Sequence, residues 1–287
     1  MAAPSHSTTT QVRSRSNVDQ FYPVLKRPVS DTGGRVWAIG AIHGEIYKLE
    51  MLHDAIAARL RPGDSVVYLG NYMGYGNDVT EVLTEMLRFR CWFLARPPFV
   101  HEDDFVMLRG AQEEMFQKLL QIQFAAHPQD LLDWMLQRGL ESTLLAYGTD
   151  AAEGYKAARE GTLGLTYWTT DIRRHLKAHP GHEILITKLK RAAYTEEGSL
   201  LFVAAGLDNT KPLQGQADSL WWAARSFEAI DEPYRGFAKV VRGYDPDHRG
   251  LVETDFTISI DGGAGRGGTM MAVCLNRDSA LDDIVTV

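Results

Sequence analysis

Three short apolar segments of the chain each end in a polar turn that contains glycine. The turns cover residues 40–44, 70–76 and 109–114, and the segments before them cover residues 36–39, 66–69 and 105–108. Turns that end the strands of a sheet meet at one edge, where α/β proteins place their chemistry. A hydrolase that uses two metal ions needs carboxylates and imidazoles there. Apart from two glutamates that open a helical segment, these turns contain no carboxylate, and their one imidazole is that of His43.

Two arginines adjoin turns of this kind. Arg109 begins the third turn, and Arg242 ends a later apolar segment, residues 238–242. An arginine can hold a phosphate without a metal through paired hydrogen bonds. Either residue could equally form a salt bridge at the surface or between strands. We expect Arg109 and Arg242 to bind an anion, with the salt bridge as the alternative.

Several carboxylates could replace the missing metal ligands, although such groups near loop ends more often stay solvated or cap a helix. They are Glu45, Glu113, Glu114, Asp208 and Asp245. A further glycine-rich segment, residues 263–268, fits the dinucleotide-binding pattern G-x-G-x-x-G. The residues after it favour a strand rather than the helix that this site requires, so we interpret the segment as a hairpin.

The elements around the turns alternate in type. Residues 49–60 and 78–88 have helical spacing and separate the three apolar segments. Residues 113–193 are mostly helical, and short strands follow residue 200, which suggests a second, partly antiparallel sheet. Residues 1–32 are polar and lack periodicity, so we expect a disordered N-terminal arm. Residues 33–287 would then form a single α/β domain.

Composition restricts the class of protein. The chain has 287 residues and a net charge of −7, which argues against a general nucleic-acid binder. Its apolar runs are too short to span a bilayer, so no membrane partner is expected. Its two cysteines, Cys91 and Cys274, lack metal-type spacing and suggest core thiols in a reducing compartment. We expect a cytoplasmic location.

Five ordered motifs resemble those of the calcineurin-like metallophosphoesterases, in the bacterial serine/threonine-phosphatase-like branch. That family reads Gly-Asp-x-His-Gly, Gly-Asp-x-x-Asp-Arg-Gly and Gly-Asn-His-Glu, followed by His-Ala-Gly and Gly-His. The matching segments are residues 38–44, 68–72, 108–113, 202–208 and 241–245, and residues 260–268 resemble the family's last hairpin. The resemblance covers roughly residues 35 to 275. It implies a four-layer α/β/β/α sandwich with a helical cap insertion at about residues 115–195.

The same resemblance implies that the metal site is degenerate. Only His43 matches a metal ligand, and Glu113 matches the glutamate of the third motif. The remaining vestigial active-site positions carry other residue types: Ala41, Asn71, Gly74, Tyr75, Ala111, Gln112, Ala204 and Tyr244. Two metal ions that lie close together repel each other unless anionic ligands bridge them. We therefore expect no metal, no cofactor and no catalytic residue.

The functional expectation is a catalytically inactive pseudophosphatase that acts as a binding or regulatory protein. A protein partner and a phosphorylated ligand would follow from that role. Two alternatives remain. One is a divergent metal-dependent phosphoesterase with weak activity, which uses unusual ligands such as His43, Asn71 and Glu113. The other is a structural subunit of a protein assembly.

Overall fold

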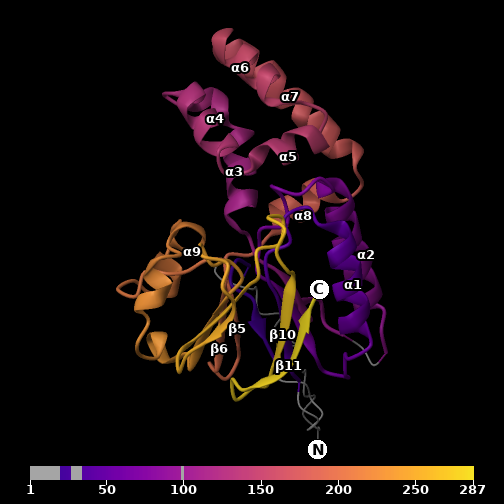
Figure 1. Cartoon of the computed structure of the whole chain (residues 1–287), viewed down its shortest axis with the longest axis vertical. Coiled ribbons are helices and arrows are strands. Elements are labelled where there is room, and N and C mark those ends of the chain that lie inside the picture. Colours follow the sequence, from indigo (N-terminus) through magenta and orange to yellow (C-terminus); the bar gives the residue numbers. More distant parts are fainter. Residues whose placement is uncertain (1–19, 27–33, 98–99) are drawn as a thin grey trace, which may run out of the picture.

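The computed structural model describes residues 20–26, 34–97 and 100–287. Two sheets pack against each other in the body, helices cover their outer faces, and a helical lobe stands on one end of the molecule (Figure 1). The order of layers is helix, sheet, sheet, helix. This confirms the expected α/β/β/α sandwich with a helical cap.

The five-stranded sheet has the order β11-β10-β2-β3-β4. Strands β2, β3 and β4 are parallel, whereas β10 pairs antiparallel with both β2 and β11. Both faces of this sheet are covered, so its central strands are apolar throughout. In β2, Trp37 and Ile39 face the helices, and Val36 and Ala38 face the other sheet. The strands are β2 (Val36–Ile39), β3 (Ser65–Tyr68), β4 (Phe105–Met107), β10 (Met271–Leu275) and β11 (Leu281–Thr286).

The six-stranded sheet has the order β1-β5-β6-β7-β9-β8 and mixes parallel with antiparallel pairs. Phe202 and Val241 of its inner face meet Val67 of the first sheet. The strands are β1 (Val24–Leu25), β5 (Ala193–Thr195), β6 (Leu200–Val203), β7 (Lys239–Arg242), β8 (Gly250–Glu253) and β9 (Thr257–Asp261).

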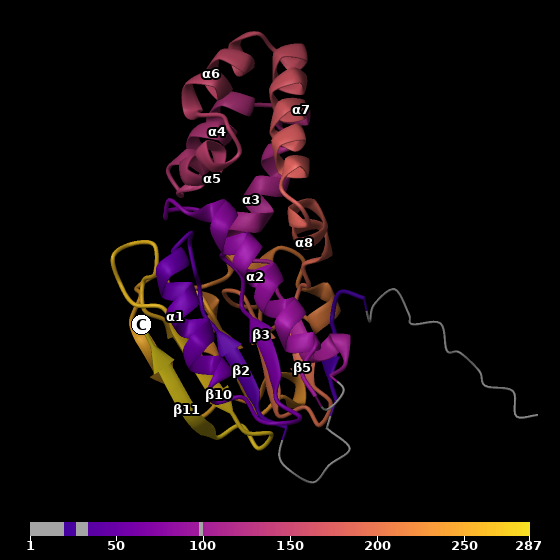
Figure 2. The same ribbon diagram turned by 90° about the vertical axis from the view of Figure 1, so that its right-hand side faces the viewer.

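Helices α1 (Ile46–Ala57) and α2 (Val79–Leu94) cover the five-stranded sheet, as Figure 2 shows, and the short α9 (Ser219–Trp222) lies over the six-stranded one. The cap continues from α3, which rises from the body, and glycines at positive φ separate some of its helices, such as Gly139 before α5 and Gly161 before α7. Its helices are α3 (Ala111–Leu119), α4 (Pro128–Leu136), α5 (Leu140–Ala146), α6 (Ala151–Arg159), α7 (Thr162–Ala178) and α8 (His182–Lys188).

Two boundaries differ from the expectation. Residues 20–26 belong to the body rather than to a disordered arm, because β1 pairs with β5 and its Leu25 side chain is fully buried. The rest of the expected arm lies outside the described residues. The helical cap also ends before the expected boundary at about residue 195, because residues 193–195 form β5. The sequence did not predict β1, because the strand has only two apolar residues and lies in a segment that is mostly polar.

The last strands are also distributed between the two sheets differently from the expectation. After the glycine-rich hairpin the chain leaves the six-stranded sheet, and β10 joins the first sheet beside β2. The hairpin therefore crosses from one sheet to the other, and a strand follows it, as expected. In the described part of the chain we find no helix that is long and apolar enough to cross a membrane.

Truncation of Leu25 tests whether β1 is part of the fold. Replacement of its fully buried side chain in Leu25→Ala should lower the free energy of unfolding by about 2 to 5 kcal/mol, since the change leaves a cavity between the sheets. Urea denaturation measures this. Lys26→Ala, at the exposed neighbouring position, is the matched control. An equal, small effect of both variants would show that residues 20–26 are not packed in solution.

Candidate functional site

The turns after β2, β3, β4, β6 and β7 meet at one edge of the two sheets. Backbone hydrogen bonds join them directly. The amide of Ala41 donates to the carbonyl of Gly243 at 3.1 Å, and the amide of His43 donates to Asn71 at 3.0 Å. Gly243 and Tyr244 both donate to the carbonyl of Ala204, at 3.2 and 3.0 Å. The structure thus brings the positions of all five motifs together, and we call this region the loop edge.

The buried carboxylate of Glu113 organises the centre of the loop edge. Its two oxygens accept four backbone N–H groups, from Asn71 (2.9 Å), Tyr72 (2.8 Å), Met73 (3.3 Å) and Gly110 (2.8 Å). Burial raises the pKa of this carboxyl, and the four donors oppose that rise. Because these bonds occupy the carboxylate, Glu113 is a structural anchor rather than a replacement metal ligand.

The side chains of Asn71 and Gln112, two positions where the motifs depart from the resembled family, connect the loops and the cap. Asn71, whose backbone has a positive φ of 60°, accepts the amide N–H of Gln112 at its Oδ1 (3.2 Å). Gln112 donates from Nε2 to the carbonyl of Arg138 in the cap (2.7 Å). A Cβ at Gly74 would lie 2.4 Å from the Gln112 side chain, so this glycine makes room for the glutamine.

The second motif loop makes further contacts with the cap. The amide of Gly74 donates to Oγ1 of Thr143 (3.2 Å), and the amide of Tyr75 donates to the carbonyl of Gly139 (3.2 Å). The hydroxyl of Ser142 donates in turn to the carbonyl of Tyr75 (2.9 Å). The turn between α4 and α5 is therefore fastened to the loop edge.

His43 lies at the loop edge, as the sequence predicted, and in the described part of the chain one of its ring nitrogens has no hydrogen-bond partner. The side chain is 2% exposed, and Nδ1 lies 3.0 Å from the carbonyl of Met73, where it can only donate. Nε2 is buried and makes no hydrogen bond within the described residues. Burial lowers the pKa of His43 to about 4. The ring is therefore neutral at pH 7, with a lone pair on Nε2.

A second imidazole lies close to His43. Nδ1 of His248 is 2.9 Å from Oδ2 of Asp261, which is itself buried and also accepts the amides of Asp245 and Gly263 at 2.9 Å. The glycine-rich hairpin packs against both histidine residues. A Cβ at Gly265 would lie only 2.4 Å from that of His43, and one at Gly263 would lie 3.4 Å from that of His248.

Sequence analysis missed His248 and Asp261. Asp261 is the last residue of an apolar strand, directly before the hairpin. The other residues of the loop edge also lie at the ends of apolar strands, so the sequence could have indicated Asp261. His248 gave no comparable signal, because only the loop after β7 brings it back to Asp261. The ring of Tyr244, at a former ligand position, meets that of His248 edge-on at 5.9 Å.

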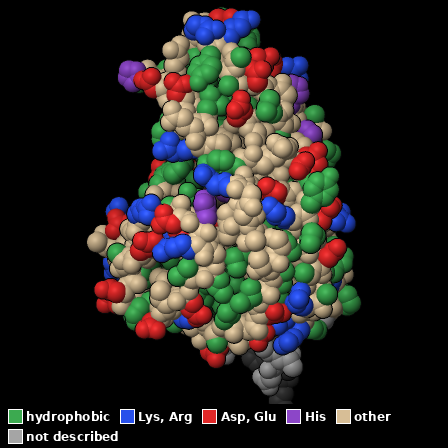
Figure 3. All heavy atoms as spheres, viewed as in Figure 1, with side chains coloured by type: hydrophobic (Ala, Val, Ile, Leu, Met, Phe, Trp, Pro, Cys, Tyr) green, Lys and Arg blue, Asp and Glu red, His purple; other side chains and the backbone are tan. Residues whose placement is uncertain are grey.

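Aromatic and cationic side chains form the rim of the site. Arg266 stacks on the ring of Tyr75 at 4.2 Å and donates to its hydroxyl at 2.5 Å. Trp134 of the cap meets Trp222 at a centroid distance of 5.4 Å, and Arg138 lies 4.3 Å from the Trp134 ring. Figure 3 shows an indented surface between the cap and the lobe that carries α9, where basic and histidine side chains are visible.

The two arginines expected to bind an anion both have carboxylate partners. Arg242 is fully buried, pairs with Asp245 at 3.0 Å and bonds to Ser259 and to the carbonyl of Ala224. Burial lowers its pKa, and Asp245 opposes this. Arg109 pairs with Glu114 at 3.1 Å and remains 19% exposed. Both residues therefore form the salt bridge that was the alternative to anion binding, and Arg242 faces the interior.

The residues at the loop edge do not fit a binuclear metal centre of the kind that the resembled family holds. Ala41, Ala204 and Tyr244 supply no ligand of the required type, and Asn71 is already bonded to Gln112. Within the described residues, one group of three acidic side chains has its ligand atoms within 4.8 Å of one another, namely Glu228, Asp245 and Asp247. Ion pairs already join these carboxylates to Arg225, Arg242 and Arg249.

Neutralisation of Glu113 should loosen the loop edge. In Glu113→Gln, an amide N–H₂ replaces one acceptor oxygen and opposes two backbone donors, so the free energy of unfolding should fall by about 3 kcal/mol. Glu114→Gln, one residue along α3, removes the same charge from a partly exposed pair and should cost less than about 1 kcal/mol. Equal losses in the two variants, measured by urea denaturation, would contradict the anchoring role.

His43 should make the protein less stable in acid. Its pKa is about 4 when folded and 6.5 ordinarily, so between these values the unfolded chain binds a proton that the folded chain does not. Stability should therefore fall as the pH falls through this interval, by about 3 kcal/mol from this group. In His43→Asn, which tolerates the positive φ of 51°, the fall should be shallower by that amount. An unchanged pH profile of unfolding would contradict the neutral, buried imidazole.

Comparisons with known proteins agree with this architecture. No protein-family model and no curated protein matches the chain. A solved structure of a protein proposed to be a diadenosine tetraphosphatase aligns with a TM-score of 0.50 and 17% identity, over 91% of this chain and 96% of its own. A serine/threonine phosphatase from Saccharomyces cerevisiae with similarity to human phosphatase PP5 gives 0.48 and 11%, over 91% and 82%. A metallophosphoesterase from Sphaerobacter thermophilus gives 0.41 and 14%, over 89% and 88%.

These matches correct one expectation. The chain was expected not to be an enzyme, but the structure that aligns with it at a TM-score of 0.50 belongs to a protein proposed to be a diadenosine tetraphosphatase, so this expectation has no support. Altered ligand positions show a changed site and do not by themselves show an inactive one. By its layers, its strand order and this structural similarity, the chain has the fold of the calcineurin-like metallophosphoesterases.

Proposed function

We propose that this chain is a divergent phosphoesterase that acts on a phosphorylated ligand at the loop edge, with imidazoles rather than a metal pair as its reactive groups. One observation carries the proposal. The Nε2 atom of His43 is buried and has no partner among the residues that the structure describes, and the bond that Nδ1 makes to Met73 holds it as a lone-pair acceptor. A buried polar atom without a partner is costly, so it marks a place where a ligand or a water would bind.

The neighbouring groups suit hydrolysis of a phosphoester. The neutral ring of His43 accepts a proton from a water molecule as that water attacks phosphorus. The bond from phosphorus to the ester oxygen breaks, and this oxygen takes a proton from His248 or from solvent. Asp261 fixes the orientation of the His248 ring through Nδ1, and Arg266 supplies a cation for the phosphoryl oxygens.

The residues at the rim of the site favour a protein as the substrate that carries the phosphoryl group. Trp222 is 37% exposed and contacts Trp134 across the boundary between cap and body, with Arg138 beside them. Tryptophan and arginine are the residues that most often dominate the binding energy of protein interfaces. A phosphorylated side chain would therefore reach the loop edge while its peptide lies against these residues.

Hydrolysis assays in the presence of a chelator test the proposal. The wild-type protein should hydrolyse a phosphorylated peptide better than a generic aryl phosphate. His43→Asn should lower kcat/KM for both by about a hundredfold or more, since a general base contributes on that scale. Trp222→Ala should weaken turnover of the peptide only. His101→Ala, an exposed histidine at the opposite end of β4, is the matched control.

Three outcomes would contradict parts of this proposal. Wild-type protein that neither hydrolyses the two substrates nor binds inorganic phosphate at millimolar concentration would overturn it. Activity that the chelator abolishes would contradict the absence of a metal from the reaction. Equal activity in His43→Asn and His101→Ala would show that the unpartnered imidazole takes no part.

A further inference from the structure

A cavity lies apart from the loop edge. It has a volume of about 380 Å³ and opens beside β4, which is the outer strand of the five-stranded sheet. Helix α2 borders it on one side, α8 on another, and the short 3-10 helix Glu102–Asp104 closes its third side. Cavities of this size accommodate small molecules.

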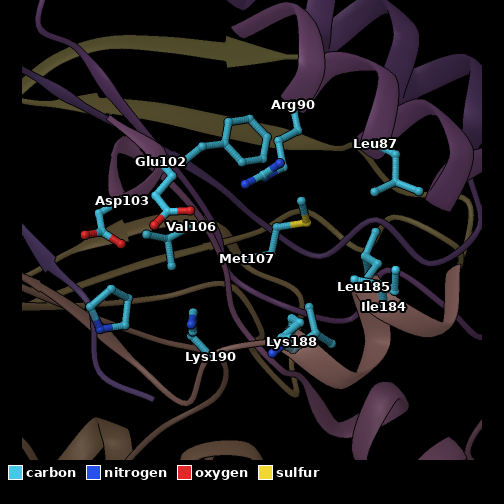
Figure 4. Close-up of a pocket in the computed structure, with 13 residues that line it drawn as sticks. Leu87, Arg90, Glu102, Asp103, Val106, Met107, Ile184, Leu185, Lys188 and Lys190 are labelled. Atoms are coloured by element: carbon cyan, nitrogen blue, oxygen red, sulfur yellow. The ribbon is translucent and has the colours of Figure 1, made fainter. Parts of the chain in front are cut away.

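The cavity has an apolar wall and a charged wall, as Figure 4 shows. Leu87, Leu185 and Ile184 gather at one side, and Met107 projects from the centre. Glu102 and Asp103 lie together at the opposite side, and Arg90 points in between the two sides from α2. A ligand that fits both walls has an apolar body and a polar end.

The cations of the cavity determine the charge of that polar end. Neither the side chain of Arg90 nor that of Lys188 makes a hydrogen bond or ion pair with any residue in the described ranges. Lys190 already donates to the carbonyl of Gln20 at 2.7 Å, and Glu102 and Asp103 have partners of their own. The binding capacity left over is therefore cationic, on Arg90 and Lys188.

We propose that this cavity binds a small amphipathic anion, with its carboxylate or similar head on Arg90 and Lys188 and its apolar body against Leu87, Met107 and Leu185. A planar guanidinium binds a carboxylate through two parallel hydrogen bonds, which a lysine ammonium can supplement. Burial of the hydrocarbon against the apolar wall adds the remaining affinity. This binding site is independent of the function proposed for the loop edge.

Titration calorimetry with decanoate tests the inference. Decanoate has the anionic head and the apolar body, decan-1-ol has the body alone, and acetate has the head alone. Saturable binding is expected for decanoate and should be at least about tenfold weaker for each of the other two compounds. Arg90→Gln should weaken decanoate binding about tenfold or more, and Lys188→Gln should weaken it less.

Matched variants separate this site from non-specific effects. Arg159→Gln removes the same charge from an exposed position on α6 in the cap and should leave the affinity unchanged. His43→Asn should leave it unchanged as well, so that failure at one site cannot be confused with failure at the other. No saturable decanoate binding, equal binding of decan-1-ol, or equal weakening by Arg90→Gln and Arg159→Gln would overturn the inference.

Discussion

The buried carboxylate of Glu113 is the interaction on which the rest of the loop edge depends. A carboxyl group buried inside a protein is tolerated only with hydrogen-bond partners, and the backbone here supplies four donors from two loops. To supply them, the chain after β3 must turn tightly around the start of α3, with Asn71 at positive φ. That turn places the carbonyls of Asn71 and Met73 where they bond the backbone and the ring of His43.

Much of the fold was predictable from the sequence, because each central strand is an apolar run that ends at a glycine turn. The strands that escaped prediction carry weaker signals. β1 has only two residues, and β11 alternates between exposed and partly buried positions at the edge of its sheet. The route of β10 was unpredictable for another reason: an apolar strand does not specify which of two sheets it joins.

The site was only partly predictable, for a physical reason that Arg242 illustrates. Sequence position placed this arginine at the loop edge, but its side chain turns inward to Asp245 and to the ring of Phe227 at 4.3 Å. Likewise, His248 meets Asp261 only in the folded chain. The changes of residue type at the motif positions predict no metal pair, but they did not reveal that Gln112 bonds to the cap.

The central claim is that His43 presents an unprotonated Nε2 to a ligand at the loop edge. Nitrogen-15 NMR of the imidazole rings tests this most directly, because the two ring nitrogens have different chemical shifts in each protonation state. At pH 7 the account predicts a neutral His43 ring with its proton on Nδ1, and a shift of the Nε2 resonance when phosphate is added. A charged ring, a proton on Nε2, or resonances that phosphate leaves unchanged would contradict it.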